Sequence, residues 1–108
     1  MNERERRLGE NEVLYRDVNE RVRELNEQFG IDDRIEFVCE CASLECSARI
    51  TLTKAEYEHV RADGARFAVM PGHEDPTIEH VIARNERYFT IAKDDDGPAQ
   101  LARDADPR

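Results

Sequence analysis

Four residues of this 108-residue chain have types and spacing that suit metal binding. Cys39, Cys41 and Cys46 fall within eight residues of sequence, and His73 directly follows a Pro71-Gly72 pair. Zinc in proteins prefers about four thiolate or imidazole ligands arranged as a tetrahedron. Three cysteines and one histidine fill that shell and leave no open position for a substrate. The sequence therefore predicts a structural Cys3His zinc site.

Other interpretations of these residues stay open at the level of sequence. The Cys-x-Cys-x4-Cys spacing differs from the Cys-x2-Cys pair of most zinc ribbons, so an iron–sulfur cluster and reversible thiol chemistry are alternatives. The thiols could also be buried simply as small hydrophobic groups. His59 and His80 compete with His73 as the fourth ligand. We favour His73 because a Pro-Gly turn can direct the next side chain back toward the cysteines, and we expect Glu74 to orient its imidazole.

The residues on both sides of the cysteine cluster alternate as they do in β-strands. Side chains that share one face are Ile35, Phe37, Cys39 and Cys41 in the first segment, and Cys46, Ala48, Ile50 and Leu52 in the second. Glu36, Val38 and Glu40 would then lie on a solvated face. This pattern predicts an antiparallel hairpin that carries all three thiols on its inner side, with residues 42–45 forming both the turn and the metal loop.

An amphipathic helix is predicted ahead of this hairpin, from about Asn11 to Phe29. Its apolar side chains recur at steps of three and four residues, at Leu14, Val18, Val22, Leu25 and Phe29. Gly30 is placed to end the helix with a left-handed residue. We expect this apolar stripe to pack on the sheet, and the alternative is that it binds a partner.

The second half of the chain predicts one more helix and more strands. Thr53 and Glu56 have the spacing of a capping box, which indicates a short helix over residues 54–62. Residues 67–70 read as a buried strand that leads to the Pro-Gly turn. Residues 78–93 suit a strand hairpin, although Asp75-Pro76 could instead begin a helical turn. The expected class is α+β, with a small antiparallel sheet.

The predicted organisation is a single domain with two weakly structured ends. Residues 1–10 are expected to be a flexible N-terminus, and residues 11–93 a single zinc-stabilised α+β domain. Residues 94–108 are rich in charge and poor in apolar side chains, so we expect a disordered acidic tail.

The net charge and the hydropathy of the chain indicate which class of partner and which cellular location to expect. The net charge is −9, which disfavours nucleic acid as a partner and favours another protein. The longest apolar runs are far shorter than the ~20 residues of a membrane span, and the first residues lack the apolar core of a signal peptide. A cytoplasmic location is therefore predicted, and there three closely spaced cysteines favour metal binding over disulfides.

Three segments of the chain also resemble a known group. They are the Phe37-to-Cys46 cysteine segment, the helix at Thr53-Lys54-Ala55-Glu56-Tyr57, and the Phe67-Ala68-Val69-Met70-Pro71-Gly72-His73-Glu74 run. Together they look like a group of small uncharacterised bacterial proteins, over about residues 10–93. The resemblance implies the same four ligands, Cys39, Cys41, Cys46 and His73. The chain has Ala42 where the group's pattern leads us to expect Gly, and Asn85-Glu86 where an Asp-Gly turn would be usual.

Three functions are compatible with this sequence. The first is a zinc-stabilised protein-interaction or regulatory module, which needs no catalytic residues, and the sequence shows no nucleophile or phosphate-loop motif. The second is a redox sensor in which Cys39 and Cys41 react and Cys46 resolves, but Glu36, Glu40 and Glu45 are acidic neighbours that disfavour reactive thiolates. The third is a zinc-dependent nucleic-acid-binding regulator, whose few basic residues are diluted by acidic ones. The oligomeric state is left open.

Overall fold

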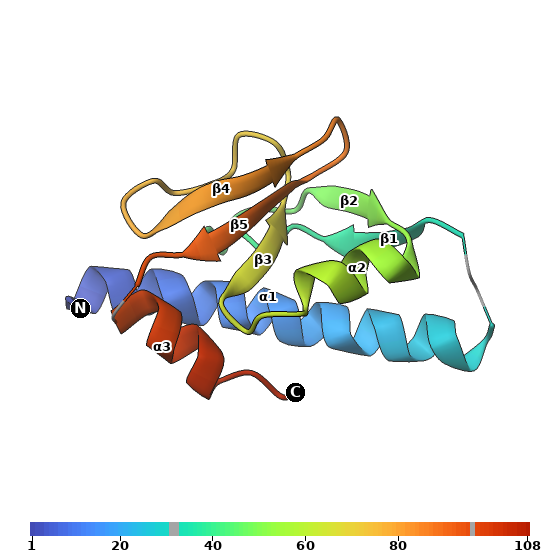
Figure 1. The fold of residues 1–108 in the computed structure, drawn as a ribbon, viewed down its shortest axis with the longest axis horizontal. Coiled ribbons are helices and arrows are strands. Elements are labelled where there is room, and N and C mark those ends of the chain that lie inside the picture. The colour runs from blue at the N-terminus through green and yellow to red at the C-terminus, as the bar shows by residue number, and fades with distance from the viewer. Residues whose placement is uncertain (31–32, 96) are drawn as a thin grey trace.

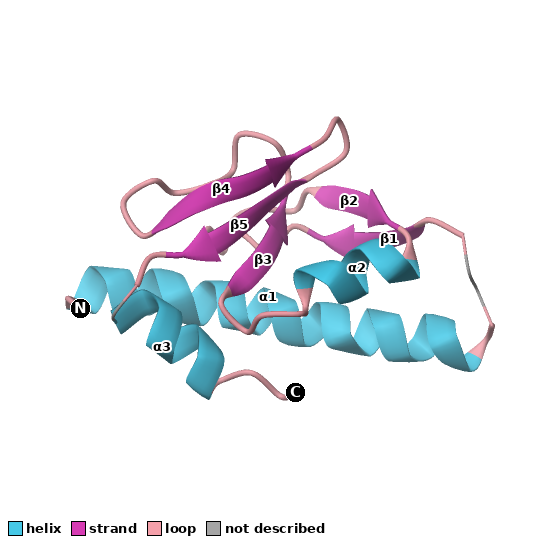
Figure 2. Cartoon of the chain, in the orientation of Figure 1, coloured by secondary structure: helices cyan, strands magenta, loops and turns pink. Residues whose placement is uncertain are grey.

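The computed structural model describes residues 1–30, 33–95 and 97–108. Its elements in chain order are α1 (Glu3–Gln28), β1 (Ile35–Val38), β2 (Arg49–Leu52), α2 (Lys54–Val60), β3 (Arg66–Val69), β4 (Glu79–Arg84), β5 (Phe89–Lys93) and α3 (Gly97–Asp104). In these ranges β1 and β2 pair in one small antiparallel sheet, and β3, β5 and β4 form another in that order. Helix α1 runs along the length of the molecule beside both sheets (Figure 1, Figure 2). The predicted α+β class is confirmed.

Helix α1 is longer than the sequence suggested. It begins at a capping box in which the Asn2 side chain accepts the Glu5 backbone N–H at 2.7 Å, and the Glu5 carboxylate accepts the Asn2 N–H at 3.3 Å. Residues 3–10, which were expected to be flexible, are therefore helical. At the other end Gly30 has a φ of +69°, as expected for a left-handed residue after a helix.

The face that α1 turns toward the rest of the protein is polar. Glu12, Arg16, Asn19 and Glu20 are buried there. Buried polar groups need hydrogen-bond partners, and Arg16 finds them in backbone carbonyls. Its guanidinium donates to Gly64 O at 2.6 Å and to Ala102 O at 2.8 Å. The expectation that the apolar stripe packs on the sheet is wrong for all its members except the half-buried Val22.

The β1–β2 hairpin is confirmed, with Phe37 opposite Ile50. The cysteines nevertheless lie outside the strands, because β1 ends at Val38 and β2 begins at Arg49. The following helix, α2, begins at the predicted capping box of Thr53 and Glu56 and ends at Val60. Its Tyr57 ring stacks on Phe37 with 4.4 Å between centroids, which fixes α2 on the smaller sheet.

The hairpin predicted for residues 78–93 is also confirmed, as β4 and β5. Its turn uses Asn85 in place of the usual Asp-Gly pair. The Asn85 side-chain oxygen accepts the backbone N–H groups of Arg87 and Tyr88, each at 2.8 Å. A local side-chain bond of this kind stabilises a turn without a glycine.

The chain after residue 96 differs from the disordered tail expected from composition. It forms α3, which packs on α1 and buries Ala99 and Ala102. The two helices approach closely at Gly9, where an added Cβ would lie 3.3 Å from Leu101 Cδ2. Small residues at the contact give α3 a packed face despite its low apolar content.

Candidate metal centre

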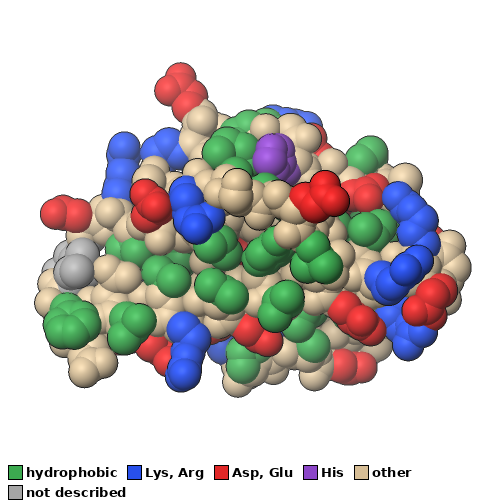
Figure 3. All heavy atoms as spheres, turned by 180° about the vertical axis from the view of Figure 1, so that it is seen from behind, with side chains coloured by type: hydrophobic (Ala, Val, Ile, Leu, Met, Phe, Trp, Pro, Cys, Tyr) green, Lys and Arg blue, Asp and Glu red, His purple; other side chains and the backbone are tan. Residues whose placement is uncertain are grey.

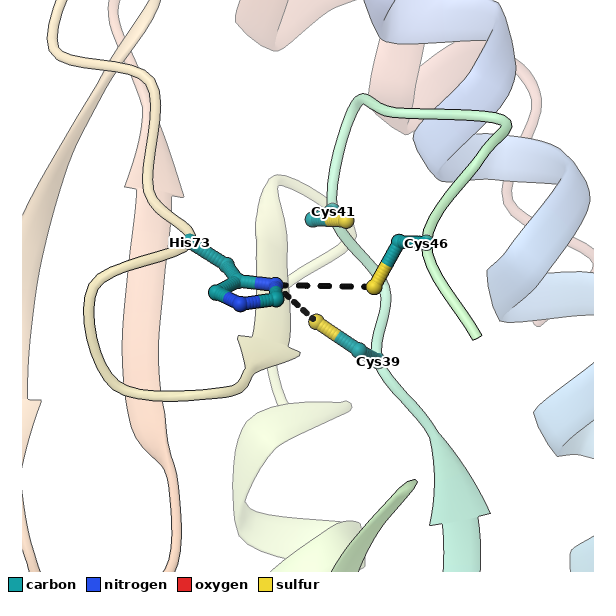
Figure 4. Close-up of side chains that lie close together, drawn as sticks. All are labelled: Cys39, Cys41, Cys46 and His73. Atoms are coloured by element: carbon teal, nitrogen blue, oxygen red, sulfur yellow. Dashed lines mark hydrogen bonds between the residues drawn. The ribbon is translucent and has the colours of Figure 1, made fainter. Parts of the chain in front are cut away.

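The four candidate ligands lie together in the structure. The ligand atoms of Cys39, Cys41, Cys46 and His73 are all within 4.8 Å of one another. His73 Nδ1 faces two of the sulfurs, at 3.6 Å from Cys39 Sγ and 3.5 Å from Cys46 Sγ (Figure 4). A tetrahedral zinc ion with ordinary bond lengths requires an S···N separation of roughly 3.6 Å. The cluster can therefore hold one metal ion.

Cys39 and Cys41 are positioned by backbone hydrogen bonds just beyond the end of β1. The Cys39 N–H donates to Ala48 O at 3.1 Å, which extends the hairpin by one bond. The next N–H, of Glu40, donates to Ala68 O on β3 at 2.9 Å. Both cysteines are 2% exposed. The segment is thus held between the two sheets, with its thiols shielded from solvent.

Glu40, the residue between these cysteines, is fully buried and not solvated as the alternation predicted. Its carboxylate accepts three hydrogen bonds, from Asn19 Nδ2 at 2.8 Å, the Tyr57 hydroxyl at 3.1 Å and the Ala68 N–H at 2.9 Å. Burial raises the pKa of Glu40, while these donors oppose the shift. Glu40 points away from the sulfurs, as chelation requires, but it does so into a polar pocket between α1, α2 and β3.

The loop that leads to Cys46 is tied to α1. Asn11 Nδ2 donates to Ala42 O at 2.8 Å, and the Tyr15 hydroxyl donates to Cys46 O at 3.4 Å. Within the loop the Cys46 N–H donates to Ser43 O at 3.2 Å. Cys46 is the most accessible thiol of the three. The helix thus supports the loop from behind while the sulfurs point toward His73.

His73 enters the cluster from the connection between β3 and β4. Gly72 has a φ of +90°, and the His73 N–H donates to Met70 O at 2.9 Å, as in a tight turn with glycine in its third position. The Pro-Gly turn therefore does what the sequence predicted of it. The expectation for Glu74 is not met, because its Oε1 is buried without a hydrogen-bond partner among the described residues.

The two rival histidines lie elsewhere. His59 is in the last turn of α2. His80 on β4 has its Nδ1 at 3.0 Å from Asp94 Oδ1. Neither belongs to the cluster that the structure brings together in its described residues.

The electrostatics of the cysteines favour a bound cation. The hydrogen bond from Cys39 lowers the pKa of Cys41 to about 5, and the same contact, together with burial, raises the pKa of Cys39. The Met70 N–H also donates to Cys39 Sγ at 3.1 Å, a contact that stabilises a thiolate. A divalent ion would stabilise the thiolate forms of these cysteines and displace their protons.

Comparison with known proteins adds nothing to this geometry: no family model matches the chain, and no curated protein or solved structure matches it. Within the described ranges, no helix has the length and apolar character needed to cross a membrane.

Proposed function

We propose that the chain is a zinc protein in which Cys39, Cys41, Cys46 and His73 form a closed structural site. The observation that carries this proposal is the fit of the His73 Nδ1-to-sulfur distances, 3.5 and 3.6 Å, to a tetrahedral zinc shell. Thiolates exclude the hard cations Ca²⁺ and Mg²⁺, which bind oxygen. Iron–sulfur clusters are usually held by four cysteines, and this chain has three.

The role of the metal is to join the two sheets. Its three thiolates come from the β1–β2 connection, and its imidazole comes from the β3–β4 connection. Apart from the metal, direct bonds across this junction include Glu40 N–H to Ala68 O and Met70 N–H to Cys39 Sγ. A small domain gains much of its stability from such a crosslink, because the binding energy of a structural zinc ion is also folding energy.

A protein-interaction or regulatory module is the biological role that this site supports best. A filled four-ligand shell leaves no position for a substrate, so the metal serves the fold. The burial of Cys39 and Cys41 disfavours the redox alternative, because reactive cysteines are accessible. The net charge of −9 disfavours the nucleic-acid alternative. A reducing cytoplasm would keep the thiols available for zinc.

Elemental analysis of protein purified without chelators tests the metal proposal. We expect one zinc per chain, with thiols that react only after chelation or unfolding. The variants Cys39→Ser and Cys41→Ser should lose the metal, while Ser43→Ala in the same loop should retain it. Metal-free protein whose thiols titrate freely in the native state would overturn the proposal. Iron found together with inorganic sulfide would also overturn it, because the site would then hold an iron–sulfur cluster.

A further inference from the structure

Three ionisable side chains are buried together where the first half of α1 meets β4 and β5 (Figure 1). Glu12 comes from α1, Glu79 from β4 and Lys93 from β5, and their side chains are 0%, 0% and 1% exposed. Many other acidic and basic side chains lie at the surface, as Figure 3 shows for one face of the molecule. We call these three residues the buried triad. Ionisable groups are rarely buried this completely unless they are paired, so the balance of charge within the triad decides how stable this contact is.

The triad contains two carboxyl groups and a single cation. Lys93 Nζ donates to Glu12 Oε1 and, at 3.1 Å, to Glu79 Oε1. If both carboxyl groups were ionised, the triad would keep one uncompensated negative charge away from solvent, which is costly. A proton held by one of the carboxyl groups makes the triad neutral. The charges therefore favour one carboxyl group that stays protonated.

The hydrogen bonds indicate that Glu12 holds this proton. Both oxygens of Glu79 accept a donor, since Oε1 accepts Lys93 Nζ and Oε2 accepts the Asp75 backbone N–H at 2.9 Å. Glu12 Oε2, in contrast, is buried without a hydrogen-bond partner among the described residues. An ionised Glu12 would place charge on an oxygen that has no donor, whereas Glu79 is satisfied as a carboxylate.

The surroundings of Glu12 act in the same direction. Burial raises the pKa of Glu12 well above its usual range, and a hydrogen bond with Glu79 raises it further. Two carboxyl groups can share a hydrogen bond only while one of them holds a proton. The negative charge of Glu79 adds to this effect, and the ammonium group of Lys93 opposes it.

Charged groups on the neighbouring segments face away from the triad or have partners of their own. Arg66 of β3 and His80 of β4 both lie opposite Ala92, and side chains alternate along a strand, so they are on the other face of the sheet from Lys93. Groups with separate partners are Arg16 with Gly64 O and Ala102 O, Glu40 with Asn19 and Tyr57, Asp75 with Arg4, Arg103 with Asp63, and Asp104 with Gln100. A proton on Glu12 is therefore what neutralises the triad.

We propose that the buried triad is a pH-sensitive contact that holds the first half of α1 on β4 and β5 while Glu12 is protonated. When the pH rises, the O–H bond of Glu12 breaks, the proton passes to solvent, and the triad acquires one net negative charge. Glu12 Oε2 must then be hydrated, and water reaches this buried atom where α1 separates from the sheet. Alkaline pH therefore loosens this half of the helix. The inference goes beyond the proposed function, because it does not involve the metal.

The direction of the pH effect follows from the raised pKa of Glu12. A pKa above the unfolded value of 4.5 contributes stability that is complete below pH 4.5 and is lost as the pH rises through the raised value. Between the two values the folded protein holds one proton more than the unfolded chain. The unfolding equilibrium constant then rises by up to about tenfold per pH unit.

Carbon-13 NMR of the side-chain carboxyl groups tests the protonation of Glu12 in the wild-type chain. We expect Glu12 to titrate at a higher pH than the exposed glutamates. In Glu79→Gln, Glu12 keeps Lys93 but has no carboxyl group with which to share a proton, so it should titrate at a lower pH than in the wild type. A wild-type Glu12 signal that titrates together with the exposed glutamates overturns the inference, whether or not any variant folds well.

Urea denaturation from about pH 5 to about pH 9 tests the effect on stability, with Glu12→Gln as a variant that resembles protonated Glu12. The two proteins should be nearly equal at the acid end, and the wild type should become the less stable one as the pH rises. Glu24→Gln changes an exposed residue on the same helix and should follow the wild-type profile. A difference between wild type and Glu12→Gln that stays constant with pH contradicts the proposal.

Hydrogen exchange locates the loosening. At about pH 9 the first half of α1 should exchange faster in the wild type than in Glu12→Gln, and at about pH 5 the two proteins should exchange alike. Comparing the proteins at one pH cancels the intrinsic effect of pH on exchange. Equal exchange of this segment in both proteins at the alkaline end would show that the triad does not control the contact.

Discussion

The Asn19 side chain hydrogen-bonds both backbone polar groups of Val38. Its Nδ2 donates to Val38 O and its Oδ1 accepts the Val38 N–H, each at 2.9 Å. The same Nδ2 donates to Glu40 Oε2 at 2.8 Å. Through one amide, α1 therefore holds the residues on either side of Cys39. The polar inward face of this helix therefore helps to position the candidate metal ligands.

Replacing Asn19 with Ala should damage both the fold and the metal site. The change leaves two backbone groups of Val38 unpaired in a partly buried place, which we expect to cost about 1–3 kcal/mol of stability. Zinc affinity should fall as well, because Cys39 loses its support. Urea denaturation and competition with a chelating dye measure the two effects. Asn26→Ala is a control on the same helix, since in the described part of the chain its amide donates to Val22 O and not to the cysteine segment. Unchanged zinc affinity in Asn19→Ala would show that the ligands are positioned without α1.

His73→Ala should remove the fourth ligand, since the imidazole Nδ1 is the atom nearest the sulfurs. We expect the zinc affinity to fall by orders of magnitude and the spectrum of cobalt-substituted protein to change. His80→Ala and His59→Ala should leave both unaltered. A changed cobalt spectrum in His80→Ala would contradict the assignment.

The buried charges around Lys93 give a prediction about stability. Lys93 Nζ lies 2.5 Å from Glu12 Oε1 and 3.1 Å from Glu79 Oε1, and all three side chains are shielded from solvent. Lys93→Met leaves the carboxyl groups without their cation, at an expected cost of about 3–5 kcal/mol. Lys54→Met, which breaks an exposed pair with Glu27, should cost less than about 1 kcal/mol.

Glu12 should tolerate neutralisation better than Lys93 does. Burial raises the pKa of Glu12 well above its usual range, and the neighbouring Glu79 raises it further. Glu12→Gln keeps the shape and removes the cost of a buried charge, so we expect a change within about 1 kcal/mol. Denaturation midpoints of Glu12→Gln and Lys93→Met, compared at one pH, check this order. A larger loss for Glu12→Gln would show that Glu12 is needed in its ionised form.

The Glu56–Arg87 pair predicts a pH dependence. Hydrogen bonds from Arg87 lower the pKa of Glu56 to about 2, from an unperturbed value of 4.5. The pair's stabilisation is therefore fully present above pH 4.5 and is lost as the pH falls toward about 2. Wild type should be more stable than Glu56→Gln at pH 7, and the difference should shrink below pH 4.5. Taking the difference cancels the loss of metal in acid, which affects both proteins. A constant difference across this range would contradict the assignment.

The sequence predicted the local signals well and the polar interior poorly. The capping box of Thr53 and Glu56 and the turn before His73 depend on residues close in sequence, so the sequence alone can predict them. Glu40 was misplaced because strict alternation assumes one solvated face, whereas Asn19 and Tyr57 cover that face with hydrogen-bond donors. Such burial depends on which distant element covers the strand, and no local pattern records it.

The same limit explains the orientation of α1. Glu12, Arg16 and Asn19 follow helical spacing as regularly as the apolar stripe does, so the sequence contains two candidate inner faces. Hydrophobicity alone favours burying the apolar stripe. The polar face is buried instead because the fold offers it partners there: Lys93 pairs with Glu12, and the Gly64 carbonyl accepts a hydrogen bond from Arg16.

Deleting residues 97–108 should lower the stability of the protein, contrary to what composition alone predicts. The segment buries Ala99 and Ala102 and provides ion pairs of Asp106 with Arg61, and of Arg108 with Glu20 and Glu58. Arg61 is buried and pairs with Asp106 and Glu20 among the residues that the structure describes, so the deletion removes one of these carboxylates. We expect the melting temperature to fall by several degrees, as about 1–2 kcal/mol does for a domain of this size.

The metal should stay bound in this truncated protein, because all four candidate ligands lie on the β1–β2 and β3–β4 connections, although Ala102 of α3 belongs to the same core cluster as Cys39 and Cys41. Arg108→Ala should have a smaller effect, since its pairs are partly solvated. Differential scanning calorimetry with zinc analysis separates these effects. An unchanged melting temperature after truncation would mean that α3 adds no stability, and that the low apolar content of this segment decides its behaviour after all.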